Sequence, residues 1–144
     1  MTKSILETIN NKIKELQKNL ILLKSVAQDV NEENIKVDMI KYWGIERGIQ
    51  ISIECVIDIS NIIISALGIE KPDTYKESIL ALSKVGVLPQ TFARNVSSMV
   101  SFRNILVHDY MKVEERIIVD ILKNHLDDFV KYIDYINKWI DENY

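Results

Sequence analysis

The sequence predicts an all-α fold, a single-domain antiparallel bundle of four long helices plus one short helix. Apolar residues recur at gaps of three and four along most of the 144-residue chain, which is the period of an amphipathic helix. Only four glycines and two prolines interrupt this pattern. Hydrophobic residues make up 47% and charged residues 27% of the chain, a composition typical of a compact helical protein. A chain of this length is expected to form one domain, residues 1–144, with its own core.

The first helix is predicted from an apolar stripe whose gaps alternate between three and four without a miss. Its members are Leu6, Ile9, Ile13, Leu16, Leu20, Leu23, Ala27 and Val30. Residues 31–34 have the composition of a turn. Asp38 can cap a second helix that runs to Leu67, and Gly68 can adopt the left-handed conformation that ends many helices.

The second helix is apolar on most sides but carries one polar stripe at helical spacing. This polar stripe consists of Arg47, Gln50, Glu54, Asp58, Asn61 and Ser65. It must face water, another subunit or a site. Its charged members interrupt the apolar residues of this helix well short of the roughly 20 that a membrane span needs, so no membrane association is expected.

The remaining helices follow from breaks in the pattern. Pro72 begins a break, residues 74–82 suit a short third helix, and residues 86–89 form a connector. A fifth helix is expected from near Glu114 almost to the end of the chain. Its inner face would consist of Ile118, Leu122, His125, Phe129, Tyr132, Ile136 and Trp139.

The fourth helix, from about residue 90 into residues 103–110, carries a charge on its inward stripe. That stripe is Phe92, Val96, Met99, Arg103, Leu106 and Tyr110. An always-charged guanidinium costs several kcal/mol to desolvate unless something compensates it. Arg103 therefore requires an acidic partner such as Glu54 or Asp58, a polar subunit interface, or a bound anion.

Residues 103–110 bring together groups that handle phosphate and protons. Asn104 and His108 are four residues apart and would share a helix face beside Arg103, where the amide can orient the imidazole. Tyr110 lies two turns beyond Arg103 and returns to its side of the helix. We interpret Arg103 and His108 as catalytic residues, with Asn104 and Tyr110 supporting them.

These groups suit the cleavage of RNA without a metal. The guanidinium can stabilise charge on phosphate oxygens and the imidazole can exchange a proton. RNA supplies its own nucleophile, the 2′-hydroxyl, so the products would carry 2′,3′-cyclic phosphate and 5′-hydroxyl ends. One histidine cannot easily act as both acid and base, so water, Tyr110 or a second chain must help.

The pattern of Arg, a polar residue, three apolar residues, His, any residue and Tyr resembles the HepT branch of the HEPN superfamily. The resemblance covers the motif and the surrounding order of helices. It implies a HEPN-like homodimer with the two motifs in a cleft between subunits, and an endoribonuclease toxin of a type VII toxin–antitoxin pair. It also implies a partner, an MntA-like minimal nucleotidyltransferase antitoxin, that adenylylates Tyr110 with AMP from ATP. The alternative is a noncatalytic nucleotide-binding or substrate-binding subunit of a nucleotidyltransferase, and a third reading makes the motif a polar seam that locks a dimer.

Composition limits the other possibilities. The net charge of −3 means that any RNA contact must come from a local patch. Cys55 is the only cysteine and the chain has two histidines, so no disulfide, metal site or cofactor is expected. The N-terminus lacks the apolar block of a secretory signal, and a cytoplasmic protein is expected. We interpret His125 as a core or interface residue, and Trp43 and Trp139 as packing residues.

Overall fold

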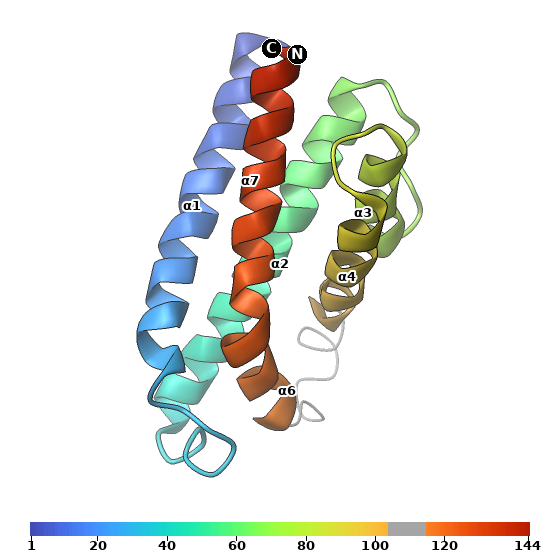
Figure 1. Ribbon diagram of the computed structural model, residues 1–144. Coiled ribbons are helices and arrows are strands. Elements are labelled where there is room, and N and C mark those ends of the chain that lie inside the picture. Colours follow the sequence, from blue (N-terminus) through green and yellow to red (C-terminus); the bar gives the residue numbers. More distant parts are fainter. Residues whose placement is uncertain (104–114) are drawn as a thin grey trace.

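The computed structural model describes residues 1–103 and 115–144, and every regular element within them is helical (Figure 1). The predicted all-α bundle is confirmed. The elements are α1 (Lys3–Ala27), α2 (Met39–Ala66), α3 (Tyr75–Lys84), α4 (Gln90–Val100), α6 (Glu115–Asp120), a π-helical turn (Ile121–His125) and α7 (Leu126–Asn143).

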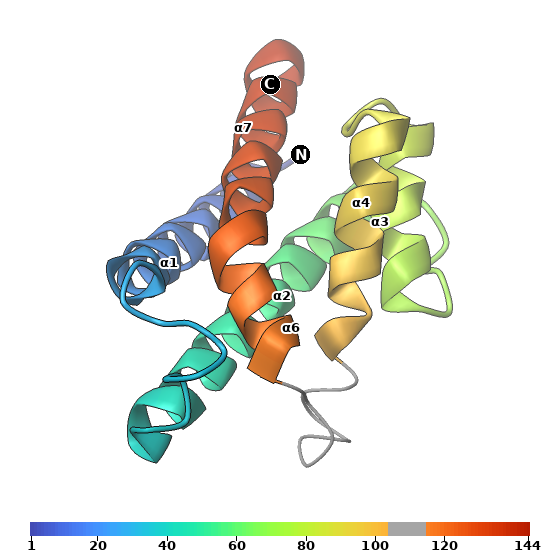
Figure 2. The same cartoon turned by 60° about the horizontal axis from the view of Figure 1, so that its bottom comes forward.

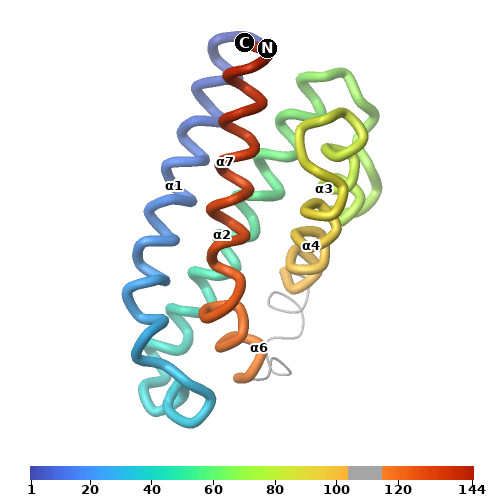
Figure 3. The backbone as a smooth tube through the Cα atoms, in the orientation of Figure 1, coloured from blue at the N-terminus to red at the C-terminus, as the bar shows by residue number. Residues whose placement is uncertain are grey.

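The helices form two groups that meet along α2. Helices α1 and α2 make an antiparallel hairpin, and α7 packs beside α1 so that both termini lie at the same end of the bundle (Figures 1 and 3). Helices α3 and α4 pair with each other on the other side of α2. The turned view in Figure 2 shows α2 passing between these two groups. Helix α2 is therefore the element on which both groups converge.

The ends of the helices follow the predicted local chemistry. The side chain of Asp38 accepts a hydrogen bond of 3.1 Å from the backbone N–H of Lys41, and Thr74 caps α3 in the same way. Each such cap contributes about 1 kcal/mol. Gly68 and Gly86 have φ angles of +71° and +80°, a conformation that side chains with a Cβ rarely adopt. Asp38 as a cap and Gly68 as a helix stop are both confirmed.

The core is built around the isoleucines of α2. Ile49, Ile53, Ile59 and Ile63 are completely buried. One polar cluster lies among them, where Ser60 and Tyr132 share a hydrogen bond of 2.7 Å between their hydroxyl oxygens. Because every member of this cluster has a partner, it ties α7 to α2 without leaving an unsatisfied polar group.

Helix α2 is long and apolar enough to cross a membrane by length and composition alone. The expectation that the polar stripe leaves too few apolar residues for a membrane span is therefore wrong on length and composition. However, 56% of its most apolar 18-residue window is buried inside the bundle. This burial is what a core helix requires, since its apolar faces are covered by α1, α3 and α7.

Two predicted helices differ from the structure. Helix α4 ends at Val100 and Ser101 forms a turn, after which residues 102–103 are helical again, and the rest of the predicted fourth helix lies outside the described residues. The hydroxyls of Ser97, Ser98 and Ser101 donate to backbone carbonyls three or four residues earlier, which competes with a regular helix at this point. The fifth helix is likewise not continuous, because a π-helical turn separates α6 from α7.

The two tryptophans differ. Trp139 is 9% exposed and packs in the core as predicted. The prediction for Trp43 is wrong, since its side chain is 61% exposed, near Val37 and Ile40, which are also exposed. The helical period accounts for this exposure, because Trp43 lies four residues before Arg47 and so continues the polar stripe of α2.

Candidate active site

Arg103 is the motif residue that the structure describes, and it faces α2. Its Nε lies 3.6 Å from Oε1 of Glu54, and the side chain is 23% exposed. Of the three predicted ways to compensate Arg103, an acidic partner on α2 is therefore present. The distance is too long for a hydrogen bond, and the buried Nε has no hydrogen-bond partner among the described residues. The ion pair therefore compensates the guanidinium charge only in part, and the Nε–H group of Arg103 has no acceptor among the described residues.

An aromatic ring completes the surroundings of this guanidinium. The guanidinium carbon of Arg103 lies 5.2 Å from the ring centroid of Tyr75, at the start of α3. This is a cation–π contact, which favours the planar guanidinium over an ammonium group. Tyr75 thus helps to hold the Arg103 side chain in one orientation.

Arg103 borders a cavity of ≈ 370 Å³ between α2 and the segment that leads into α3. Its lining is mostly polar, and the polar members are Glu54, Asp58, Asn61, Lys71, Tyr75 and Arg103. The polar stripe predicted on the second helix therefore forms one wall of a site. We call this space the Arg103 cavity.

The charges of the Arg103 cavity are largely paired. Asp58 accepts a hydrogen bond of 3.3 Å from the ammonium of Lys12, and this bond is the main reason that the pKa of Lys12 is raised. Glu54 accepts from the side-chain amide of Gln50 at 3.1 Å and faces Arg103. Because these carboxylates are each matched by a cation, the cavity can admit a phosphate without strong repulsion.

The other predicted site residues, Asn104, His108 and Tyr110, lie outside the residues that the structure describes. Their predicted positions relative to Arg103 stay predictions. Lys71 and Tyr75 were not predicted as site residues. They precede Arg103 by 32 and 28 residues and belong to no motif, so only the packing of α3 on α2 reveals them.

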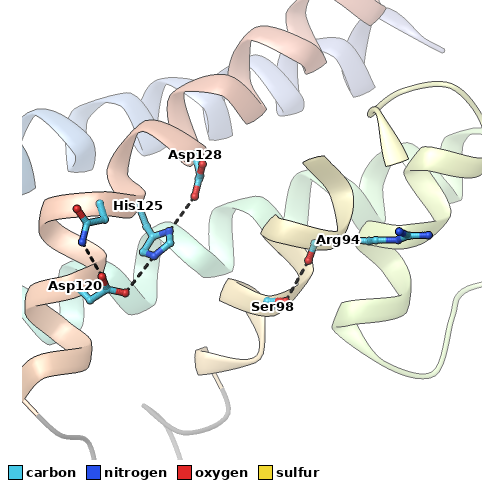
Figure 4. Close-up of polar contacts among 6 residues, drawn as sticks. Arg94, Ser98, Asp120, His125 and Asp128 are labelled. Carbon is cyan, nitrogen blue, oxygen red and sulfur yellow. Dashed lines mark hydrogen bonds and ion pairs between the residues drawn. The ribbon is translucent and has the colours of Figure 1, made fainter. Parts of the chain in front are cut away.

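His125 lies in the π-helical turn, with its ring between Asp120 and Asp128 (Figure 4). Its Nδ1 is 3.0 Å from Asp128 and its Nε2 is 3.1 Å from Asp120. The side chain is 41% exposed, so the prediction of a core histidine is wrong, while its role in an interface stays untested. The wider turn moves the residue off the apolar stripe that a regular helix would have kept. The hydrogen bond to Asp128, with the negative charge of both aspartates, raises the pKa of His125.

The raised pKa of His125 predicts a pH-dependent contribution to stability. A group whose pKa is raised on folding stabilises the fold fully below its unfolded pKa, about 6.5, and loses this effect as the pH rises through the folded value. We expect the His125→Gln variant to unfold more easily than the wild type at about pH 5.5, with a smaller difference at about pH 9. The effect should stay below about 1 kcal/mol because the ring is partly exposed. Urea unfolding of both proteins at both pH values measures it, and an equal difference at both would contradict this assignment.

No group of three or more histidine, cysteine, aspartate or glutamate side chains able to hold a metal ion occurs in the part of the chain that the structure describes. Cys55 is buried, and burial raises the pKa of its thiol to about 11. Such a thiol is protonated at neutral pH and is a poor nucleophile. The chemistry available at the described site is therefore that of Arg103 and its polar neighbours.

Comparison with known proteins places this site in a family. The family model described as ribonuclease HepT-like matches residues 9–136. The mRNA nuclease HepT of Shewanella oneidensis is 29% identical over 130 residues, which is 90% of this chain and 96% of that protein. The tRNA nuclease HepT of Aphanizomenon flos-aquae is 27% identical over 95 residues, covering 66% of this chain and 65% of that protein.

A solved structure agrees with these relatives. The tri-AMPylated HEPN toxin of Shewanella oneidensis, in complex with its MNT antitoxin, superposes with a TM-score of 0.82 at 28% identity, over 96% of this chain and 99% of the toxin. Since the family model matches nearly the whole bundle, including Arg103 and the segment that follows it, this chain belongs to the HepT-like ribonuclease family.

Proposed function

We propose that this protein is the toxin of a type VII toxin–antitoxin pair and acts as a metal-independent endoribonuclease. The observation that carries the proposal is Arg103, whose largely buried guanidinium lines a polar cavity, in a chain of the HepT-like ribonuclease family. Two relatives are named nucleases of mRNA and of tRNA. RNA is therefore the substrate class that we propose for this chain.

The proposed reaction is an internal transesterification of RNA. The 2′-oxygen forms a bond to the adjacent phosphorus, the bond from phosphorus to the 5′-oxygen breaks, and the products are a 2′,3′-cyclic phosphate and a 5′-hydroxyl. The proton of the 2′-hydroxyl leaves and the departing 5′-oxygen gains one. His108 carries one of these protons, and Arg103 stabilises the charge on the phosphate oxygens.

We also propose that the active form is a homodimer. A single motif holds one histidine, whereas the reaction needs both a base and an acid. Two motifs meeting in a cleft between subunits would supply both. Val37, Ile40 and Trp43 are exposed apolar side chains at or just before the N-terminal end of α2, and exposed apolar surface of this kind can serve as a protein contact.

The proposed partner is an MntA-like minimal nucleotidyltransferase antitoxin that transfers AMP from ATP to Tyr110. The related Shewanella oneidensis toxin is AMPylated and bound to an MNT antitoxin. An AMP group on Tyr110 would bring a phosphate to the guanidinium that the RNA phosphate needs. Modification and substrate would then compete for Arg103. We place both partners in the cytoplasm, where RNA and ATP are present.

The Tyr110→Phe variant tests the modification. It is expected to remain folded, because it removes only one hydroxyl, but to accept no AMP. The measurement is the intact mass after incubation with ATP and the MNT antitoxin of the Shewanella oneidensis relative, with the wild type as positive control. Tyr75→Phe is the matched variant and should still be modified. Recovery of AMP on Tyr110→Phe protein would refute the assignment.

Induced expression in growing bacteria tests the proposed function as a whole. The chain is expected to stop growth and fragment cellular RNA. Intact RNA and normal growth, with protein whose mass shows an unmodified Tyr110, would contradict it. That outcome would favour the noncatalytic subunit of a nucleotidyltransferase.

A further inference from the structure

Tyr75 borders a second cavity next to the Arg103 cavity. This second cavity has a volume of ≈ 320 Å³ and is lined by Lys71, Pro72, Asp73, Thr74, Tyr75 and Ser78; we call it the Tyr75 cavity. Lys71 and Tyr75 line both spaces, whereas Arg103 lines only the first. Both volumes fall within the range of small-ligand pockets, about 300–1,000 Å³. A ligand with two parts can therefore place one part beside the guanidinium and the other against the tyrosine ring.

The ring of Tyr75 remains available to a ligand although it contacts Arg103. The side chain is 36% exposed and stands at the first position of α3. The guanidinium carbon of Arg103 lies 5.2 Å from the ring centroid. Unpaired RNA bases stack on aromatic rings of this kind. The Tyr75 ring thus offers a stacking surface next to the group that we propose to contact the cleaved phosphate.

The charges around the two cavities favour a phosphate in one and a base in the other. Lys71 is exposed and has no ion pair with another described residue, so it adds a second cation beside Arg103. Asp73 lines only the Tyr75 cavity and likewise has no ion pair within the described part of the chain. An unpaired carboxylate repels a phosphate. The Tyr75 cavity therefore suits an uncharged base.

We propose that Tyr75 and Lys71 form a nucleotide-binding subsite for the RNA strand beside the cleaved phosphate. The base stacks on Tyr75, the cleaved phosphate lies at Arg103, and the ammonium of Lys71 contacts a neighbouring phosphate of the same strand. This proposal rests on the proposed ribonuclease function and deepens it. Stacking and phosphate contacts carry little information about base identity, so the subsite holds the strand in place and tolerates any base.

Binding of an RNA that cannot be cleaved tests the role of Tyr75. An oligonucleotide whose 2′-hydroxyls are replaced by fluorine lacks the nucleophile, so the anisotropy of an attached dye reports binding alone. Tyr75→Leu should weaken binding about tenfold, as expected for the loss of one stacked base, whereas Tyr75→Phe keeps the ring and should bind nearly as tightly as the wild type. Tyr144→Leu, at an exposed tyrosine that lines neither cavity, is the control. Equal binding by wild-type and Tyr75→Leu proteins would overturn the proposal.

The Arg103→Ala background distinguishes stacking from a purely structural role of the ring. If Tyr75 only held the guanidinium, Tyr75→Leu would have no further effect once the guanidinium is gone. A ring that stacks on a base predicts that the double variant binds severalfold more weakly than Arg103→Ala protein. The same oligonucleotide at low salt, where binding is strongest, measures this difference. Equal affinities of the two proteins would contradict stacking.

The role of Lys71 is tested by the salt dependence of binding. Each phosphate contact on a single strand contributes about 0.7 to the slope of log affinity against log salt concentration. Lys71→Gln should reduce the slope by about this amount. Lys76→Gln is the matched control, because Lys76 is an exposed lysine of α3 that lines neither cavity. An unchanged slope in Lys71→Gln protein, or the same reduction in both variants, would refute the phosphate contact.

Cleavage of unmodified RNA separates this proposal from the proposed function. If the wild type cleaves RNA, and Tyr75→Leu and Lys71→Gln proteins bind and cleave as it does, the subsite is refuted and the ribonuclease stands. If both variants weaken binding of the fluorinated RNA, but wild-type protein with an unmodified Tyr110 cleaves no RNA, the ribonuclease is refuted and the subsite stands.

Discussion

Replacement of His108 by alanine is expected to abolish RNA cleavage while the protein stays folded. Proton transfer by a positioned side chain contributes about 10² to 10⁴-fold to such reactions. Of the two histidines in the chain, only His108 belongs to the motif. The rate of cleavage of a defined RNA by wild-type and His108→Ala proteins, at equal concentration and in EDTA, measures the effect.

The second histidine supplies the control for this experiment. His125 is held by Asp120 and Asp128 in the π-helical turn and has no place in the proposed reaction. The His125→Ala variant should therefore cleave at close to the wild-type rate. Survival of cleavage in His108→Ala protein, or its loss in His125→Ala protein alone, would overturn the proposed role of His108.

Replacement of Arg103 by alanine is expected to reduce cleavage by about 10² to 10³-fold, the usual effect of removing a group that stabilises charge in the transition state. Arg103→Lys should recover only part of the activity, because an ammonium group lacks the planar fork and packs less well on Tyr75. The stability of Arg103→Ala protein should fall by no more than about 1 kcal/mol, since its ion pair with Glu54 is long and partly exposed.

Two further variants distinguish catalysis from structure. Arg94→Ala, on the exposed side of α4, removes the same type of side chain outside the cavity and should leave cleavage unchanged. Glu54→Gln removes the partner charge but keeps the packing, and it should retain most of the activity. If Arg103 only locked a dimer, Arg103→Ala and Glu54→Gln would weaken the dimer alike. Analytical ultracentrifugation of both variants would show that result.

Sequence periodicity was sufficient to predict the helical bundle and the polar side of α2, but not whether that side faces water, another subunit or a site. Glu54, Asp58 and Asn61 recur at helical spacing, and a polar stripe along a core helix needs a polar environment. The same argument predicted compensation for Arg103 by an acidic residue, a polar subunit interface or a bound anion, and the structure shows Glu54 as an acidic partner.

The features that periodicity could not predict depend on tertiary packing or local backbone competition. Tyr75 reaches Arg103 only because α3 packs on α2 and α4. The end of α4 at Val100 coincides with serine hydroxyls that donate hydrogen bonds to backbone carbonyls. The π-helical turn that ends at His125 leaves apolar residues at helical spacing before and after it, so that spacing does not reveal the turn.

The ends of the RNA fragments test the central claim most directly. Purified wild-type protein is incubated with cellular RNA in EDTA, and the termini of the products are identified. Reaction through the 2′-hydroxyl, without a metal ion, predicts 2′,3′-cyclic phosphate and 5′-hydroxyl ends. Fragments with 3′-hydroxyl and 5′-phosphate ends, or cleavage that EDTA abolishes, would contradict it.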